Sequence, residues 1–579
     1  MITSIRRSLT TPLPLLRLPQ QNRGIASTAS SGFQHVLYFG NVLGYNSIDR
    51  FSKLSRAWLD SAGVSADVDH GLKWTCASGG VSHLLLSYTL LDRPLNPKAA
   101  RSEDIVPLGT LPEKETEADG QGEREVMDVQ GKKSLSSRPS KVFALGRNTH
   151  AQLGLGFSSQ EATRGMVTGQ LTGQGGVKSV VAGGTFSLVV TEGGQGSSVW
   201  VFGNDTLGQI GSSPSSSPPT TNQLDPYDIS TRLNDSDTPQ LKLLPLPKSV
   251  ELGGGEGWTV KSSAAGVDHT LLLLEREVNG CVVQQVVATG LNTDGQLGLT
   301  PDGKKDAVPI EPLLSRTFQP VPLPLTPIPS STSAGTTSAG EKIVQVECAA
   351  DTSYALTSMG NIFSWGNSEY GQSFSTIQDR ITSPIHIPNP LPAAYASYRI
   401  PRTLSPPKPV KLVAGGSFAA LLDTQNRAWI VGHHPTTTTT SDQPNPTLTL
   451  IPNLPRIQNI FSGLEYLLLT TPSSIYILGL PPTSTSTTSS SPSTPFLTPT
   501  KIPFSIPKAP RQTWLDHNPH LKMKKPTQQK GGGVGGGVRV EAAACTRDHV
   551  VIVLDDGQGD EVWGECDRVP RDKGTDVTM

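Results

Sequence analysis

The sequence predicts an all-β fold, a seven-bladed β-propeller with long disordered loop insertions. Two short patterns alternate strictly along the chain, and each adjoins an apolar run of the length of a strand. The stretches between them are polar and rich in Pro, Ser and Thr, as expected of loops. Because one such unit cannot bury its own apolar face, the units must stack, and a closed ring of blades does this without leaving open edges.

The first pattern is an alternating apolar run that ends in Gly, with Asn one or two residues later. Its clear copies end at Gly40-Asn41, Gly146-Arg147-Asn148, Gly203-Asn204, Gly290-Leu291-Asn292 and Gly366-Asn367. Weaker copies end at Gly432, Gly479 and Gly564. Several copies continue into a Gly-Gln-Leu-Gly turn, of which residues 295–298 are the clearest. Glycine suits a tight turn because it adopts positive φ without steric cost.

The second pattern is a small residue, Gly, two further residues, then a bulky residue or His that opens an apolar run. The clear copies are Ala182–Phe186, Ala265–His269 and Ala414–Phe418. Looser copies are Gly79–His83, Cys348–Thr352, Ser462–Tyr466 and Cys545–His549. Apolar runs bounded by glycines are typical of buried strands. Seven copies of this pattern and about eight of the first indicate seven blades, with the terminal strands sharing one blade.

Composition and missing motifs exclude several classes of protein. A formal net charge of −1 argues against nucleic-acid binding through overall charge. The 5 cysteines form no CxxC pair, which argues against a disulfide framework and a structural zinc site. No P-loop, no G-x-S-x-G elbow and no apolar run near the roughly 20 residues of a membrane span occurs. We therefore expect a binding or regulatory module rather than an enzyme, with no catalytic residue, metal, cofactor or transmembrane segment.

The first residues indicate a targeting leader. No Asp or Glu precedes Asp49. The same stretch is rich in hydroxyl residues and carries four arginines: Arg6, Arg7, Arg17 and Arg23. Such acid-poor, Arg- and Ser-rich leaders are typical of mitochondrial transit peptides. Residues 23–27 resemble a cleavage region. A disordered basic tail is the alternative.

This assigns residues 1–31 to a mitochondrial transit peptide and 32–566 to the propeller with low-complexity insertions, and leaves 567–579 as a disordered tail. The expected location is the mitochondrial matrix or the matrix face of the inner membrane. The insertions are expected at about 95–140, 212–250, 300–340, 375–408, 433–455 and 481–538.

In this order, the two patterns resemble the regulator-of-chromosome-condensation repeat, with residues 290–299 and 365–372 as the best segments. WD40 and kelch patterns fit less well. The leader, Val42-Leu43-Gly44 after the first copy and the stretch Val142–Val167 look most like the mitochondrial member of that family. That resemblance implies nucleotide exchange on a dynamin-like fusion GTPase of the inner membrane, or assembly of the large mitochondrial ribosomal subunit. Fungal relatives imply respiratory-complex assembly.

The resemblance also implies a contact site, because Asp and His of the second pattern touch the GTPase in exchange-factor relatives. Asp268-His269 and Asp548-His549 keep that pair and are the candidate partner-contact residues. The alternative is packing, because aromatic residues such as Phe186 and Tyr466 fill the same slot in other units. Cys348 and Cys545 occupy the small-residue position and are expected to be buried.

Three functions remain open. The first is a scaffold or assembly factor for the mitochondrial ribosome or respiratory complexes, and the second is a guanine-nucleotide exchange factor for a mitochondrial dynamin-like GTPase. The third is a nuclear exchange factor that keeps a basic tail, and an enzyme with its own active site ranks last. The partners are expected to be proteins. The basic stretch 522–530 adds RNA contact or peripheral membrane association as an alternative.

Overall fold

The computed structural model describes residues 34–54, 64, 72–90, 140–168, 171, 176–193, 196–212, 243–250, 257–300, 313–324, 328–329, 340–375, 377–400, 406–434, 447–482, 495–504 and 539–555. These residues all lie in one compact unit, Gln34–Asp556. The predicted leader (1–31), the predicted tail (567–579), the basic stretch 522–530 and the pattern copy ending at Gly564 lie outside the described residues.

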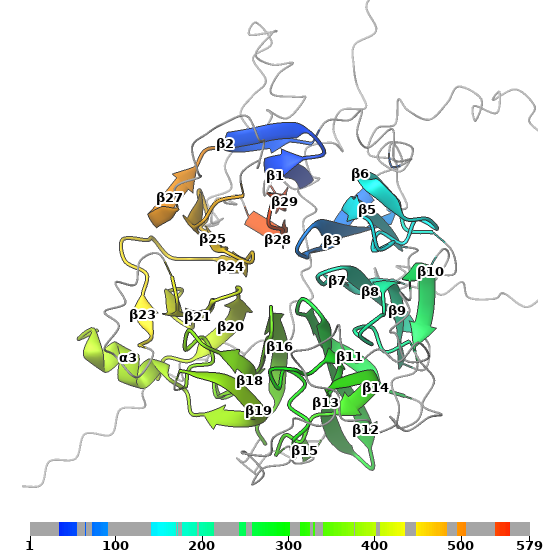
Figure 1. Cartoon of the computed structure of the whole chain (residues 1–579). Helices are drawn as coiled ribbons and strands as arrows, with labels where there is room; N and C mark the ends of the chain where they lie inside the picture. The colour runs from blue at the N-terminus through cyan, green and yellow to red at the C-terminus, as the bar shows by residue number, and fades with distance from the viewer. Residues whose placement is uncertain are drawn as a thin grey trace, which may run out of the picture. The chain divides into compact units, whose positions relative to one another are not determined.

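The described chain folds into seven antiparallel sheets, so the predicted all-β seven-bladed propeller is confirmed (Figure 1). Blade I holds β3 (Leu72–Gly79), β4 (His83–Leu90), β5 (Ser140–Asn148) and β6 (Ser159–Met166). Blade II holds β7 (Val177–Ala182), β8 (Phe186–Gly193), β9 (Gly196–Asn204) and β10 (Leu243–Val250). Blade III holds β11 (Thr259–Ala265), β12 (His269–Val278), β13 (Cys281–Leu291) and β14 (Leu314–Pro320), with β15 (Ile328–Pro329) beside β13.

Three further blades repeat this order. Blade IV holds β16 (Ile343–Ala349), β17 (Thr352–Thr357), β18 (Ile362–Ser368) and β19 (Gln378–Ile387), followed by the short helix α3 (Leu391–Ser397). Blade V holds β20 (Pro409–Ala414), β21 (Phe418–Asp423), β22 (Ala428–Gly432) and β23 (Thr449–Leu450). Blade VI holds β24 (Asn459–Ser462), β25 (Tyr466–Thr470), β26 (Ile475–Gly479) and β27 (Phe496–Ile502).

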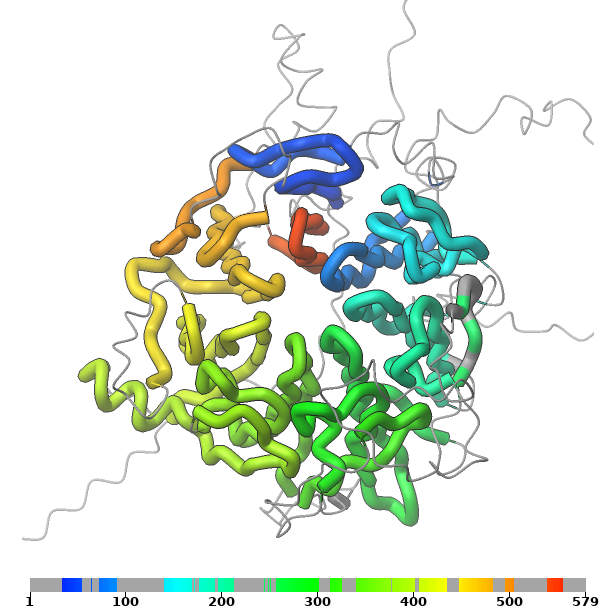
Figure 2. Tube along the Cα trace, in the orientation of Figure 1, coloured from blue at the N-terminus to red at the C-terminus, as the bar shows by residue number. Residues whose placement is uncertain are grey.

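Blade VII is assembled from both ends of the described chain. It joins β28 (Arg539–Cys545) and β29 (His549–Asp555) to β1 (Gln34–Val42) and β2 (Tyr45–Lys53), in the order β2-β1-β29-β28. Strand β1 pairs with β29 from Gln34 opposite Asp555 to Gly40 opposite His549. The innermost strands then contact one another around a closed circle, β3-β7-β11-β16-β20-β24-β28 and back to β3 (Figure 2). The two ends therefore close the ring, as the repeat count predicted.

The two sequence patterns are the two halves of one contact inside each blade. The glycine of the first pattern pairs with the bulky residue or His that ends the second pattern, which we call the slot residue. Gly290, for example, pairs with His269. A Cβ on Gly290 would lie 2.3 Å from the backbone oxygen of Asp268, and the next residue, Leu291, donates its N–H to that oxygen at 2.9 Å. The equivalent glycines of all seven blades have φ between +93° and +124°: Gly40, Gly146, Gly203, Gly290, Gly366, Gly432 and Gly479. Glycine is required because only it combines this φ with so close an approach.

The apolar core lies between blades rather than inside each of them. One cluster joins Leu271 and Val286 of blade III to Ala355 and Trp365 of blade IV. The second strand of each blade is buried on both faces, which explains why these runs read as continuous apolar stretches; every residue of β17 is buried, for example. Each blade thus needs its neighbours for stability.

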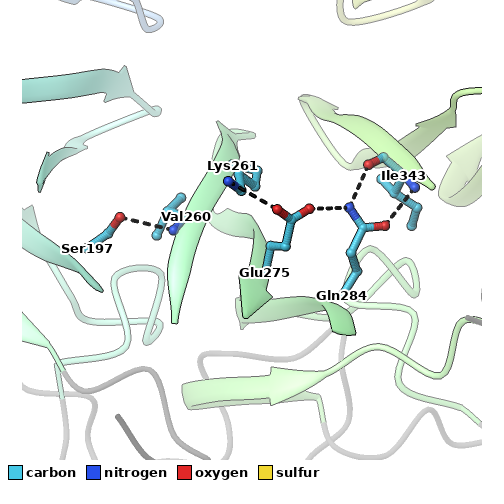
Figure 3. Close-up of polar contacts among 6 residues, drawn as sticks. All are labelled: Ser197, Val260, Lys261, Glu275, Gln284 and Ile343. Carbon is cyan, nitrogen blue, oxygen red and sulfur yellow. Dashed lines mark hydrogen bonds and ion pairs between the residues drawn. The ribbon is translucent and has the colours of Figure 1, made fainter. Parts of the chain in front are cut away.

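Hydrogen bonds also join neighbouring blades (Figure 3). The Gln284 side chain of blade III donates to the backbone oxygen of Ile343 in blade IV at 3.0 Å and accepts from the Ile343 N–H at 2.9 Å. Gln284 also donates to Glu275 at 3.1 Å, and Glu275 forms an ion pair with Lys261 at 3.1 Å. Gln34 makes the same double contact with the backbone of Trp74 across the closing seam. These contacts fix the blades relative to one another.

The fourth strands depart from the sequence prediction. Six strands and helix α3 lie in ranges that were expected to be insertions: β10, β14, β15, β19, β23 and β27. These outer strands carry little apolar periodicity because they pack on one side only and contain polar residues and prolines, as β10 and β27 do. The parts of the insertions between these elements lie largely outside the described residues.

Candidate functional site

One end of the propeller carries all the candidate residues. Because strands within a blade alternate in direction, the loops that join first to second strands and third to fourth strands meet at the same end. We call this end the turn face. It comprises residues 41–44, 80–82, 149–158, 183–185, 205–212, 266–268, 292–300, 350–351, 369–375 with 377, 415–417, 433–434, 463–465, 480–482 and 546–548.

The slot histidines point into the ring rather than out of it. His83 and His269 are fully buried. The Nε2 of His83 lies 2.8 Å from the Ser187 hydroxyl of the next blade, and the Nε2 of His269 lies 2.9 Å from the Ser353 hydroxyl. Burial lowers the pKa of His83 to about 4 and that of His269 to about 3, so both rings are neutral at physiological pH. His269 therefore joins blades III and IV.

His549 occupies the same slot in blade VII but has a different environment. His83 and His269 each meet a serine of the next blade, Ser187 and Ser353. At the equivalent position, the blade that follows His549 carries Leu84 instead. Both ring nitrogens of His549 are buried without a hydrogen-bond partner among the described residues. Burial lowers its pKa to about 4. A hollow of about 220 Å³, lined by Arg147, Asp548 and His549 among others, opens at this seam between blades VII and I.

Asp268 lies nearer the surface and forms an acidic cluster with Asp294 and Asp351, whereas Asp548 lies apart from it at the seam between blades VII and I. Asp268 accepts a hydrogen bond from the Gln209 side chain of the preceding blade at 3.4 Å, and Asp351 accepts one from Gln296 at 3.4 Å. Burial, then repulsion from Asp294 and Asp268, raises the pKa of Asp351 to about 6. Burial also raises the pKa of Asp268. The cluster can accept hydrogen bonds and pair with cations.

The glutamines of the Gly-Gln-Leu-Gly turns are structural. Each is buried, and its Oε1 accepts the N–H of the residue two positions earlier, at 2.8–3.0 Å. The residues concerned are Gln152, Gln209, Gln296 and Gln372. The turns therefore have a rigid base, and their tips project into solvent.

Four exposed apolar side chains stand on the third-to-fourth-strand loops or at their ends. Tyr45 is 54% exposed, Phe157 50%, Tyr370 47% and Ile377 52%. The rings of Tyr370 and His433 lie 5.6 Å apart, across blades IV and V. Exposed aromatic residues are enriched at protein-binding surfaces. These residues were not predicted from the sequence, because nothing in the repeat marks which loop positions face solvent. The signal that they share is that all four follow a copy of the first pattern.

Two kinds of feature are absent from the described residues. They contain no group of three His, Cys, Asp or Glu placed to hold a metal, and no helix long and apolar enough to cross a membrane. The thiols of Cys348 and Cys545 are buried, as expected, and burial raises the pKa of Cys545 to about 12. A thiol with so high a pKa is a poor nucleophile.

Comparison with known proteins gives the same architecture. No protein-family model matches the chain. The crystal structure of human WBSCR16 superposes with a TM-score of 0.50 at 16% identity, covering 90% of this chain and 99% of that one. Prp20p from Saccharomyces cerevisiae, whose binding to Gsp1p and histones was described with its structure, superposes with a TM-score of 0.50 at 13% identity over 92% and 94%. The described chain shares the propeller fold of these two structures.

The sequence match is shorter. A mouse protein named RCC1-like G exchanging factor-like protein is 32% identical over 149 residues, which are 26% of this chain and 28% of the mouse protein. The match supports the resemblance to RCC1-like proteins, where RCC1 denotes the regulator of chromosome condensation.

Proposed function

We propose that this RCC1-like propeller is a protein-interaction module that binds its partner through the turn face. The observation that carries the proposal is that exposed apolar residues, among them Phe157 and Tyr370, lie on the same face as the acidic cluster around Asp268 and Asp351. The inter-blade hydrogen bonds make the face rigid, so little conformational freedom is lost on binding.

Within this proposal, the module acts in the mitochondrial matrix or on the matrix face of the inner membrane. It serves there as a scaffold or assembly factor for the mitochondrial ribosome or for respiratory complexes. The acid-free, arginine-bearing leader supports the compartment.

A second candidate function is guanine-nucleotide exchange on a mitochondrial dynamin-like GTPase. The name of the mouse relative and the Asp-His pairs at Asp268 and Asp548 favour it. Exchange requires a surface that displaces the phosphates and the magnesium ion of the nucleotide, and no catalytic base is needed. The acidic cluster could compete for such a cation or for the basic residues that surround it.

The test is affinity purification of the tagged chain from isolated mitochondria, with proteins and RNA identified and the mature N-terminus sequenced. A Phe157→Ala, Tyr370→Ala variant should lose the partner. The matched control is Val278→Ala, Met359→Ala, because Val278 and Met359 are 37% and 60% exposed at the opposite end of the propeller. Equal recovery with both variants would contradict the turn-face proposal.

The two candidate functions give different results in the same experiment. Ribosomal or respiratory assembly proteins in the eluate support the scaffold function. A dynamin-like GTPase in the eluate, with nucleotide release that Asp268→Asn slows, supports exchange. An uncleaved chain that is absent from mitochondria would contradict the compartment on which both functions depend.

A further inference from the structure

The axis of the propeller contains a cavity of about 440 Å³, lined by the innermost strands β3, β7, β11, β16, β20, β24 and β28. Its wall is asymmetric. Blades I, III and VII contribute small side chains, such as Ala77, Ser263 and Ala543. Blades IV, V and VI contribute Glu347, Lys411, Asn459 and Phe461. Lys411, Glu347 and Asn459 therefore form a polar patch on one part of the wall, Glu541 of blade VII is the other charged residue of the lining, and blades I, II and III present small and aliphatic side chains.

Lys411 is the cationic group of this wall. Its Nζ donates to Asn459 Oδ1 at 2.7 Å and lies 4.1 Å from the centre of the Phe461 ring. An ammonium group carries three hydrogens, so it retains hydrogens for a further acceptor. Asn459 uses its oxygen for Lys411 and for the Ile460 N–H, which leaves its amide hydrogens for the cavity. Burial lowers the pKa of Lys411 to about 8, against the opposing effect of Glu347.

Glu347 stands on the adjacent blade. It accepts a hydrogen bond from Gln345 at 3.0 Å, and no ion pair joins it to Lys411 within the described part of the chain. Burial raises the pKa of Glu347 to about 7, against the lowering effects of Lys411 and Gln345. At neutral pH the carboxyl group is therefore readily protonated and then donates an O–H. Lys411 and Glu347 face a shared space that neither fills.

The remaining ionisable groups that line the cavity leave Lys411 and Glu347 available to a ligand. Glu541 on β28 has its own ion pair, with Arg539 Nε at 3.3 Å. Burial raises the pKa of the Cys76, Cys348 and Cys545 thiols, so these line the cavity as neutral groups. The uncommitted hydrogens of Lys411 and Asn459 and the O–H of protonated Glu347 all suit an anionic oxygen ligand.

We propose that the axial cavity binds a small organic carboxylate, held by Lys411, Asn459 and protonated Glu347. The alkyl part of the ligand lies against the small side chains of the opposite wall. Because the site binds the anion with Glu347 in its acid form, binding above neutral pH takes up one proton from solvent. The site uses no residue of the turn face, so it stands independently of the proposed partner-binding function.

The experiment is isothermal titration calorimetry of the full chain with sodium butanoate, with butanamide as the uncharged ligand of the same shape and sodium chloride at matched ionic strength. We expect saturable butanoate binding that weakens by about 10-fold from pH 6 to pH 8, as Glu347 loses its proton. Butanamide and chloride should give no saturable heat. No saturable butanoate binding at pH 6, or equal binding of butanamide, would overturn the proposal.

Three variants test the assignment of residues. Lys411→Met keeps the length of the side chain and should weaken butanoate binding by about 10-fold or more. Glu347→Gln keeps a donor of similar shape, so it should still bind butanoate, and only the smaller loss of affinity toward pH 8 that comes from deprotonation of Lys411 should remain. Lys261→Met is the control, because Lys261 lies on the neighbouring inner strand β11, pairs with Glu275 and does not line the cavity. An undiminished, about 10-fold weakening from pH 6 to pH 8 in Glu347→Gln would remove Glu347 from the site.

A folded-state check accompanies each variant. The far-ultraviolet circular dichroism spectrum should stay close to that of the parent chain, and Lys411→Met should lower the Tm only modestly, because it removes one hydrogen bond between blades V and VI and leaves the apolar inter-blade core intact. If Lys411→Met fails to fold, the variant Asn459→Asp tests the proposal in its place. It places a carboxylate beside the ligand and should abolish butanoate binding, and retained binding in that variant would overturn the proposal.

Discussion

Blades III and VII carry the same Asp-His pair at the same repeat position, yet the histidine has different neighbours in the two blades. Blade III is continuous in sequence, and His269 bonds to Ser353 of the next blade at 2.9 Å. Blade VII joins strands from the two ends of the described chain, and His549 faces a blade that offers Leu84 in place of that serine. The same motif is thus a stabilising contact in one blade and an unsatisfied buried group in the other.

The base of the slot differs as well. In blade III the His269 ring covers Gly266, where a Cβ would approach the ring within 2.2 Å. In blade VII the equivalent residue is Thr546, whose hydroxyl instead donates to the His549 backbone oxygen at 2.9 Å. Blade VII therefore lacks the hydrogen bond that the slot histidine of blade III makes with its neighbour, although Gln34 still joins blade VII to the Trp74 backbone of blade I. The ring thus accommodates a slot without this hydrogen bond in the blade that joins the two ends of the described chain.

The largest effect is expected from breaking that strand exchange. Gly40→Ala places a Cβ 2.5 Å from the backbone oxygen of Asp548 at a residue with φ of +93°. Strain and clash together should lower the free energy of unfolding by about 3 kcal/mol or more. The control, Gly44→Ala, has φ of +87° but no atom within 4 Å of the added Cβ, and should cost about 1 kcal/mol. Urea unfolding measures both, and equal costs would show that the seam is not closely packed.

A smaller effect should separate the two histidines. His269→Leu removes a buried hydrogen bond and leaves the Ser353 hydroxyl with one partner fewer, so it should cost about 2 kcal/mol. His549→Leu removes an imidazole that has no partner, so it should be neutral or stabilise the fold by about 1 kcal/mol. Chemical denaturation at pH 7 compares them. A larger loss in His549→Leu than in His269→Leu would mean that the blade VII imidazole has a stabilising role.

Much of this architecture could be predicted from the sequence, because its strongest constraints are local. The pairing of Gly290 with His269 requires a glycine and a bulky residue at fixed places, and both leave a repeating trace. The serine that forms the hydrogen bond with the His269 ring leaves no such trace in the sequence. Ser353 is a single residue 84 positions away, and it resembles any other strand residue. Likewise, Phe157 and Tyr370 are exposed because of where their turns project, and the sidedness of the axial cavity depends on which inner strands meet around the ring.

The smallest expected effect tests whether the blade VII slot can be converted into that of blade III. Leu84→Ser supplies the hydroxyl that Ser353 gives to His269, but it also removes a fully buried leucine, so the single variant should lose about 3 kcal/mol. The informative quantity is the coupling energy in a double-mutant cycle with His549→Leu. A new hydrogen bond between the introduced hydroxyl and the His549 ring should make this coupling about 0.5–1 kcal/mol, favouring the pair. A coupling of zero would show that the His549 ring does not face blade I as His269 faces blade IV.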